Sequence, residues 1–199
     1  MTVTEEQYLA LERASATKNE YRRGRIVAMA GASPKHNLIV GNLILALGTA
    51  LRGRGCKLFP SDQRVHIAAR GAFLYPDITL TCEKPTFHSR DENSLTNPGL
   101  IVEVLSKTTE ARDRGGKFHD YQEIPSLQHY VLVSQDERRV EHFERLPSGR
   151  WSLGNVVDEG TLRIPSMGVE IPLADIYAGL EDLEETSPSP APPSSIQPV

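Results

Sequence analysis

The chain has 199 residues, of which 39% are hydrophobic and 24% charged, and it carries a net charge of −4. This composition is ordinary for a folded cytoplasmic protein with a buried core, and the acidic balance argues against a general nucleic-acid binder. No apolar run reaches the roughly 18–20 residues that span a bilayer, and the first residues lack the basic-then-apolar order of a signal peptide.

The first predicted elements are a short helix and a hairpin. Thr4 and Gln7 fit a capping box at the start of a helix over residues 5–13. Residues 19–21 and 25–29 have the pattern of two strands joined by a tight turn. Because the helix carries few apolar residues, we expect it to lie at the periphery of the fold.

A longer helix follows. Ser33, with a proline directly after it, marks the N-cap of a helix that continues to about residue 51. Gly41 and Gly48 recur at helical spacing, and we expect them to let the helix pack closely against a sheet. His36 lies in the first turn, where a capping or surface role is more common than a catalytic one.

Three strands are predicted next, at residues 56–59, 64–68 and 75–82. The segment 83–98 is polar and contains Pro and Asn residues, which predicts an exposed loop. His88 and Asp91 in this segment are of metal-ligand type, but a mobile polar loop explains them more simply. Cys56 and Cys82 form neither a disulfide framework nor a metal-ligand spacing, so we expect two buried, reduced thiols.

The second half of the chain alternates strands and helices. A strand over 100–105 leads to a helix over 113–123, which stops before Pro125. The remaining predicted elements are strands at 128–134, 139–146, 150–156, 161–164 and 169–171 and a helix at 173–180. Together these elements indicate one domain over residues 1–185. The Ser- and Pro-rich tail, residues 186–199, cannot bury enough apolar surface to fold, and we expect it to be disordered.

Two of these strands each carry one carboxylate, and this pair is the main candidate for a functional site. Asp77 precedes the apolar end of one strand, and Glu103 lies inside an apolar run of another. A charge in such a run is costly unless it is paired or binds a cation, and two neighbouring carboxylates repel each other. Oxygen ligands of this type favour Mg²⁺ or Mn²⁺. The alternative is a set of structural ion pairs with Arg64 or Lys117.

The helix that follows adds a cation and two further polar groups. Asp113, Lys117 and Tyr121 are spaced by four residues and therefore share one face. A divalent cation can polarise a phosphoryl oxygen and acidify water. A lysine nearby would stabilise the charge that develops on phosphorus in the transition state.

The charge is unevenly distributed along the chain. Residues 18–70 contain ten basic and two acidic residues, a net charge of +8, whereas the rest of the chain sums to −12. A basic segment of this kind can bind a phosphate backbone, but an ordinary solvated surface explains the excess of basic residues equally well. A cleft bordered by Arg22, Arg23, Arg52 or Arg54 would favour DNA over a small nucleotide.

At the residues of the carboxylate pair and the helix, the chain resembles the Uma-two family of restriction endonucleases, within the PD-(D/E)xK nuclease superfamily. The resemblance rests on Pro76-Asp77, Glu103 to Ser106, Asp113, Lys117 and Tyr121, with further matches at Glu20-Tyr21, Gly24, Ser33 to His36 and Gln128 to Tyr130. It implies an α/β (α+β) fold with a mixed central sheet flanked by helices and a βαβ unit at its centre. It also implies a metal site formed by Asp77, Glu103 and the backbone carbonyl of Val104.

One position departs from the superfamily pattern. The lysine expected two residues after Glu103 is replaced by Leu105, which cannot act in its place. The resemblance points to Lys117 on the following helix as the substitute, with Lys107 as the rival. Supporting roles would fall to Glu20 as a further acid, to Asp113 as a partner of Lys117, and to His36, Ser106 and Tyr121.

The implied function is metal-dependent hydrolysis of DNA phosphodiester bonds, with Asp77, Glu103 and Lys117 as catalytic residues and Mg²⁺ or Mn²⁺ as the cofactor. Two alternatives stay open: a nuclease-fold protein that has lost catalysis and acts as a binding module, and a phosphodiesterase that acts on a small nucleotide. A Lys117 ammonium within about 4–6 Å of the two carboxylates would favour catalysis. We also consider a homodimer, because double-strand cleavage usually uses two sites.

Overall fold

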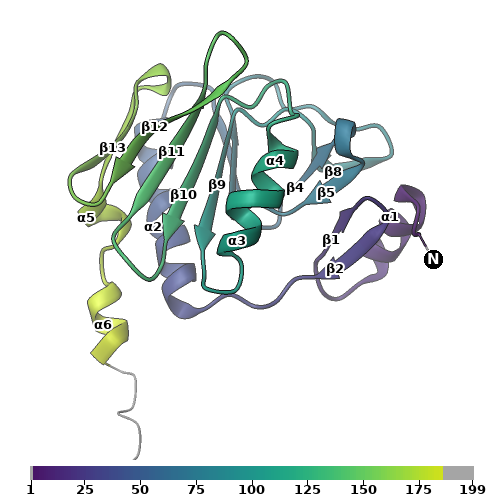
Figure 1. Ribbon diagram of the computed structural model, residues 1–199, viewed down its shortest axis with the longest axis horizontal. Coiled ribbons are helices and arrows are strands. Elements are labelled where there is room, and N and C mark those ends of the chain that lie inside the picture. The colour runs from purple at the N-terminus through teal and green to yellow at the C-terminus, as the bar shows by residue number, and fades with distance from the viewer. Residues whose placement is uncertain (1, 186–199) are drawn as a thin grey trace, which may run out of the picture.

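The computed structural model describes residues 2–185 and is built around a mixed sheet (Figure 1). Within these residues the six strands of this sheet are, in spatial order, β12 (Trp151–Val157), β11 (Val140–Arg145), β10 (His129–Ser134), β9 (Leu100–Leu105), β6 (Ile78–Thr81) and β3 (Lys57–Pro60). β9 and β10 run parallel, whereas their other neighbours are antiparallel. The predicted fold class, a mixed central sheet with a βαβ unit at its centre, is confirmed.

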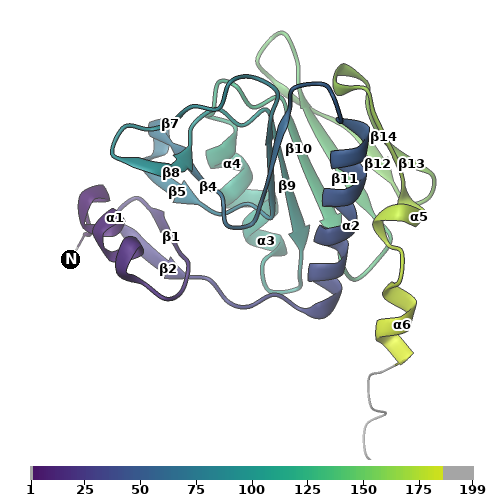
Figure 2. The same ribbon diagram turned by 180° about the vertical axis from the view of Figure 1, so that it is seen from behind.

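One face of this sheet is covered by α2 (Pro34–Ala50), which Figure 2 shows in front of the strands. The helix begins where Ser33 Oγ accepts a hydrogen bond from the His36 N–H, as the N-cap prediction requires. Ile39, Leu43 and Leu47 form its buried stripe against the apolar side chains of β6, β9 and β10. The spacing of four residues between them gives the helix one apolar face.

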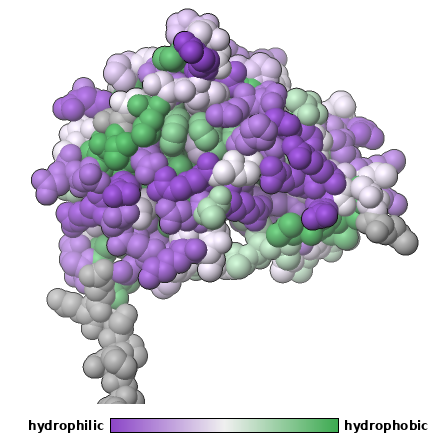
Figure 3. Space-filling model, viewed as in Figure 1, coloured by the Kyte–Doolittle hydropathy of each residue, from purple (hydrophilic) through white to green (hydrophobic). Residues whose placement is uncertain are grey.

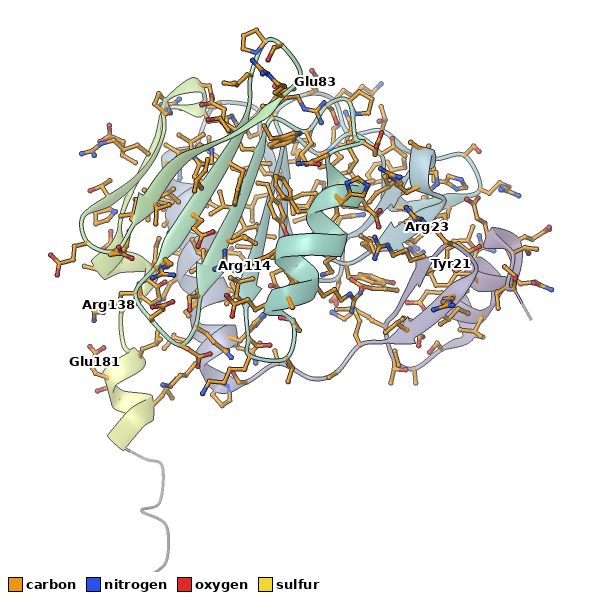
Figure 4. The ribbon with its side chains drawn as sticks, in the orientation of Figure 1. Tyr21, Arg23, Glu83, Arg114, Arg138 and Glu181 are labelled. Atoms are coloured by element: carbon orange, nitrogen blue, oxygen red, sulfur yellow. A yellow bond between two sulfur atoms is a disulfide. The ribbon has the colours of Figure 1, made fainter. Side chains whose placement is uncertain are left out.

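On the opposite face, the described part of the chain forms one helical segment, residues 110–121, which we call the site helix. It consists of α3 (Glu110–Arg112), a π-helical turn (Asp113–Lys117) and α4 (Phe118–Tyr121). Arg114 links it to β11 through an ion pair with Glu141 (Figure 4). The segment joins β9 to β10 and is therefore the crossover of the βαβ unit.

A second sheet, the N-terminal sheet, lies beside the first. Its order is β2 (Arg25–Ala28), β1 (Asn19–Arg22), β5 (Ala72–Leu74), β4 (Arg64–Ile67), β8 (Asp91–Leu95) and β7 (Phe87–His88). α1 (Glu5–Ala14) packs on it, with Tyr8 and Leu9 in a small aromatic core. The capping box of Thr4 and Gln7 and the hairpin of β1 and β2 are confirmed.

The C-terminal part of the described chain adds small elements at the far side of α2 (Figure 1). They are β13 (Thr161–Ile164), β14 (Val169–Pro172), α5 (Leu173–Ile176) and α6 (Leu180–Glu185), with a short 3₁₀ turn at Pro165–Met167; another, at Ala68–Arg70, joins β4 to β5. On the face shown in Figure 3, apolar side chains gather over β11 and β12, where Leu153 and Val156 are exposed.

The predicted tail, residues 186–199, lies outside the described residues. No helix among residues 2–185 is both long and apolar enough to cross a membrane.

The prediction of an exposed loop over residues 83–98 is wrong. β7 and β8 lie in this segment, and β8 pairs in parallel with β4. Asp91 is buried, with its Oδ2 atom 2.6 Å from Arg64 Nη2. The hydrophobic pattern does not predict this strand, because β8 is polar and supplies the buried carboxylate that the buried arginine of β4 requires.

The predicted strand over residues 75–82 is two strands in different sheets. β5 ends at Leu74 in the N-terminal sheet, and β6 begins at Ile78 in the central sheet. Pro76 lies between them and has no N–H to continue a ladder, which explains the break. The chain therefore passes from one sheet to the other directly before β6.

Two further expectations about single residues are wrong. Gly41 and Gly48 are exposed, and no neighbour lies near the position that a Cβ atom would take, so neither glycine permits a close approach to the sheet. Cys56 and Cys82 form a disulfide, and Cys82 is exposed. Sequence spacing misses this pair because antiparallel pairing of β3 with β6 brings the two cysteines together across 26 residues.

The buried pair of Arg64 and Asp91 gives a direct test of the N-terminal sheet. Asp91→Ala removes the closer carboxylate partner of the buried Arg64 and leaves, among residues 2–185, only Glu12, whose Oε1 atom lies 3.9 Å from Arg64 Nη1, so we expect it to lower the free energy of unfolding by about 3–5 kcal/mol. The matched control is Asp62→Ala, which breaks an exposed pair with Lys18 and should cost no more than about 1 kcal/mol. Urea unfolding measures both. Equal effects of the two substitutions would contradict the buried position of Asp91.

Candidate active site

A cleft of about 770 Å³ opens at the edge of the central sheet where β9 ends and β6 begins. Its walls come from β1, the start of α2, β9 and the site helix. Nine of the predicted site residues line it: Glu20, His36, Asp77, Glu103, Val104, Ser106, Lys107, Asp113 and Lys117. The tenth, Tyr121, lies beneath the cleft and contacts it through Glu103.

Asp77 stands opposite Glu103 at this edge. The antiparallel register pairs Ile78 with Val102, so the preceding and following residues of the two strands are neighbours. Asp77 Oδ2 accepts a hydrogen bond from the Val104 N–H at 2.7 Å and lies 3.1 Å from His36 Nε2. These contacts fix the aspartate at the boundary between the sheet and α2.

Glu103 is buried in the floor of the cleft, at 2% exposure. Its Oε1 atom accepts hydrogen bonds from Lys117 Nζ and from the Tyr121 hydroxyl, each at 2.9 Å. Burial raises the pKa of Glu103 to about 8, because its effect outweighs that of the Lys117 ammonium and is reinforced by Asp113 and Asp77. Without a further cation, the site therefore favours a protonated Glu103 at neutral pH.

Lys117 Nζ lies among three carboxylates, at 2.9 Å from Glu103, 3.3 Å from Glu20 and 3.4 Å from Asp113. Burial lowers the pKa of Lys117, but the nearby carboxylates outweigh burial and raise it above its usual value. The side chain therefore remains a charged ammonium at neutral pH. The helical spacing of four residues places Asp113, Lys117 and Tyr121 on the buried face of the site helix, as expected.

Arg112 is a site residue that the sequence analysis missed. It forms an ion pair with Glu20, whose other oxygen accepts a hydrogen bond from the Tyr75 N–H at 3.1 Å. Nothing in the spacing distinguishes Arg112 from a surface arginine, because its partner lies on a strand of the other sheet. Gln135 was also missed, although it follows β10 as Ser106 follows β9, and parallel strands end at the same edge of a sheet.

The basic residues at the cleft differ from those considered for DNA contact. Lys18, Lys107 and Arg112 line the cleft together with Lys117. Arg22, Arg23, Arg52 and Arg54 do not belong to its lining. Arg22 instead pairs with the buried Asp120, and Arg54 donates to the Met167 carbonyl, so part of the basic segment serves internal contacts.

The oxygen donors of the cleft fit a divalent cation. Four carboxylates, those of Glu20, Asp77, Glu103 and Asp113, line the cleft, and Lys117 and Arg112 form ion pairs with three of them. His36 adds a charge only when it is protonated. The buried oxygens of Glu20 and Asp113 that accept no hydrogen bond within residues 2–185 contact only the cations Arg112 and Lys117. Carboxylate oxygens gathered in this way are the hard donors that Mg²⁺ or Mn²⁺ takes in proteins.

The fold and the cleft define a nuclease-type α/β protein. The fold is similar to the crystal structure titled a "putative nuclease belonging to DUF820" from Anabaena variabilis, with a TM-score of 0.70, 20% identity, and coverage of 88% of this chain and 98% of that one. The chain belongs to the Uma2 family, described as "Putative restriction endonuclease", whose model matches residues 5–174.

Two proteins of Synechocystis sp. are similar in sequence over most of their length. They are named uncharacterized proteins sll1609 and slr1290 and are each 36% identical to this chain, over 157 and 178 residues respectively. The alignments cover 79% and 88% of this chain and 89% and 91% of the relatives. The family assignment therefore extends over almost all of the described residues.

The raised pKa of Glu103 predicts a pH-dependent stability in metal-free buffer. Folded protein keeps this proton up to about pH 8, whereas the unfolded chain releases it near the ordinary value of 4.5, so stability falls as pH rises between these values. Glu103→Gln abolishes that fall. We expect the stability of the variant relative to wild type to increase between pH 5 and pH 9 by at least about 1.4 kcal/mol, which corresponds to one pKa unit.

Urea unfolding at pH 5, 7 and 9 in the presence of EDTA measures this difference. Glu170→Gln is the control, because the Glu170 side chain is 70% exposed. It should shift stability by the same small amount at every pH. A constant difference between Glu103→Gln and wild type would contradict the raised pKa.

Proposed function

We propose that this protein is a metal-dependent endonuclease that hydrolyses DNA phosphodiester bonds. The observation that carries the proposal is the Lys117 ammonium, held 2.9 Å from Glu103 in a cleft that also contains Asp77. A nuclease-type fold and a family described as restriction endonucleases support the same reaction class. DNA as the substrate rests on the family description and not on the shape of the cleft.

Asp77 and Glu103, with the backbone carbonyl of Val104, would hold a Mg²⁺ or Mn²⁺ ion. Such an ion, when bound, polarises a phosphoryl oxygen and lowers the pKa of water. The burial of Glu103 and the hydrogen bond from Val104 to Asp77 keep both carboxylates in place before substrate arrives. We propose His36 and Tyr121 as positioning residues, since each contacts one of the two carboxylates.

Lys117 takes the role of the lysine that is absent at Leu105. Its ammonium is buried and held in place by three carboxylates. It therefore stabilises the negative charge that develops on phosphorus without first having to change its position. Lys107 is exposed at the rim of the same cleft and lacks such fixed partners among the described ion pairs. The preorganised lysine is therefore the better candidate for transition-state stabilisation.

The size of the cleft limits what enters it. A volume of about 770 Å³ falls within the range of roughly 300–1,000 Å³ that is typical of small-molecule pockets. It accommodates one phosphodiester and its adjoining nucleotides, while a duplex would remain on the surface. The same volume suits a small nucleotide, so a phosphodiesterase of that kind is the alternative that the assay must separate. A homodimer remains an expectation from the needs of double-strand cleavage.

Plasmid cleavage tests the proposal. We expect the wild-type protein to nick supercoiled DNA with Mg²⁺ or Mn²⁺ and to be inactive in EDTA. Asp77→Asn and Lys117→Met should each lower the rate by about 10²–10³-fold, the usual cost of removing one preorganised charged group. Lys107→Ala is the matched control and should retain most activity. Circular dichroism establishes that each variant is folded.

Several outcomes would contradict this account. Nicking that survives Lys117→Met but is lost in Lys107→Ala would transfer the role to Lys107. Hydrolysis of a dinucleotide without any nicking of plasmid would favour the phosphodiesterase. An inactive wild-type protein that also fails to bind Mn²⁺ in calorimetry would favour a binding module without catalysis.

A further inference from the structure

A second group of metal-ligand side chains lies away from the cleft, on the N-terminal sheet. Glu5 comes from the first turn of α1, His66 from β4 and His88 from β7. Their potential ligand atoms all lie within 4.8 Å of one another. None of the three residues lines the cleft of the candidate active site. Elements distant in sequence therefore bring a carboxylate and two imidazoles to one point.

His66 is held in a position that leaves its polar edge unsatisfied. Its ring lies 4.5 Å, centroid to centroid, from both Phe73 and His88, and its Nε2 atom is buried with no hydrogen-bond partner among residues 2–185. A buried polar atom without a partner is costly. Burial, and then His88, lower the pKa of His66.

One cationic group competes for this position. Arg90 Nη2 lies 3.5 Å from Glu5 Oε2, and the Arg90 N–H donates a long hydrogen bond of 3.3 Å to His88 Nδ1. The Arg90 side chain is 58% exposed and can move into solvent. Asp91 pairs with Arg64 and does not belong to this group of three potential ligands. The ion pair of Glu5 with Arg90 is therefore an exposed contact that a stronger ligand displaces.

We propose that Glu5, His66 and His88 bind a Zn²⁺ ion. Two imidazoles and one carboxylate are a common three-ligand set for zinc, with water in the remaining position. The softer nitrogen donors distinguish this site from the carboxylate-rich cleft, which favours Mg²⁺ or Mn²⁺. Such an ion ties α1 to β4 and β7 and satisfies the buried edge of His66. The proposal is independent of the proposed nuclease activity.

The test uses the full-length protein without a histidine tag. Zn²⁺ binding is measured by calorimetry, and Co²⁺ binding by visible absorption, which reports coordination geometry. We expect one strongly bound ion per chain, a higher melting temperature with Zn²⁺ than with EDTA, and at least a tenfold weaker affinity in Glu5→Gln and His88→Gln. Both substituted side chains are partly exposed, so the fold should be retained.

Three controls separate this site from others. Glu6→Gln changes an exposed neighbour on α1, Glu103→Gln alters the cleft, and His142→Gln removes a member of the other histidine pair, in which His142 Nε2 lies 2.9 Å from His129 Nδ1. All three should bind Zn²⁺ as the wild type does. Absence of Zn²⁺ binding by wild type, unchanged binding in Glu5→Gln and His88→Gln, or loss of binding in any control would overturn the proposal.

X-ray absorption at the zinc edge gives a readout that does not depend on the variants. The wild-type complex should show scattering from two imidazoles and from oxygen. A spectrum with oxygen ligands alone would overturn the proposal, because it would place the ion among carboxylates.

Discussion

The contact of Lys117 with three buried carboxylates is the interaction on which the arrangement of the molecule depends. Burial of ions is expensive, and a buried ion pair is weak support for stability compared with an apolar core. A cluster of four ionisable groups in the floor of a cleft is therefore best understood as a functional arrangement. Its members come from β1, β9 and the site helix, so the cluster exists only when both sheets and the helix are assembled.

The N-terminal sheet contributes to this cluster, because its strand β1 carries Glu20. The hairpin of β1 and β2 docks on the site helix through Asp120, which is fully buried and faces Arg22, Arg23 and Arg70. The same hairpin presents Glu20 to Lys117 and Arg112. A segment that looks peripheral in sequence thus closes one wall of the cleft.

Much of the candidate site was predictable because its signals are local. Glu103 interrupts an apolar run, and Lys117 and Tyr121 follow a helical spacing, so their common position requires only that a strand precede a helix. Arg112 and the disulfide were not predictable in this way. Each depends on a partner from a distant part of the chain, and the spacing of residues along the sequence does not identify that partner.

The errors in the fold have the same origin. β7 and β8 are polar because β8 supplies Asp91 to a buried arginine, and a polar strand is indistinguishable from a loop by hydrophobic pattern. Gly41 and Gly48 fall on the solvent face of α2, although their spacing is helical, because spacing alone does not show which face is buried. The hydrophobic pattern predicts the helices and strands, whereas only the assembled structure shows which of them pack together.

The central claim is that the carboxylates of the cleft bind a divalent cation at Asp77 and Glu103. Diffraction from crystals soaked in Mn²⁺, with anomalous data collected near the manganese edge, tests it most directly. The account predicts one strong anomalous peak in the cleft, within coordinating distance of both carboxylates and beside the Lys117 ammonium. A cleft without a peak at saturating Mn²⁺, or a peak elsewhere with Lys117 unchanged, would contradict it.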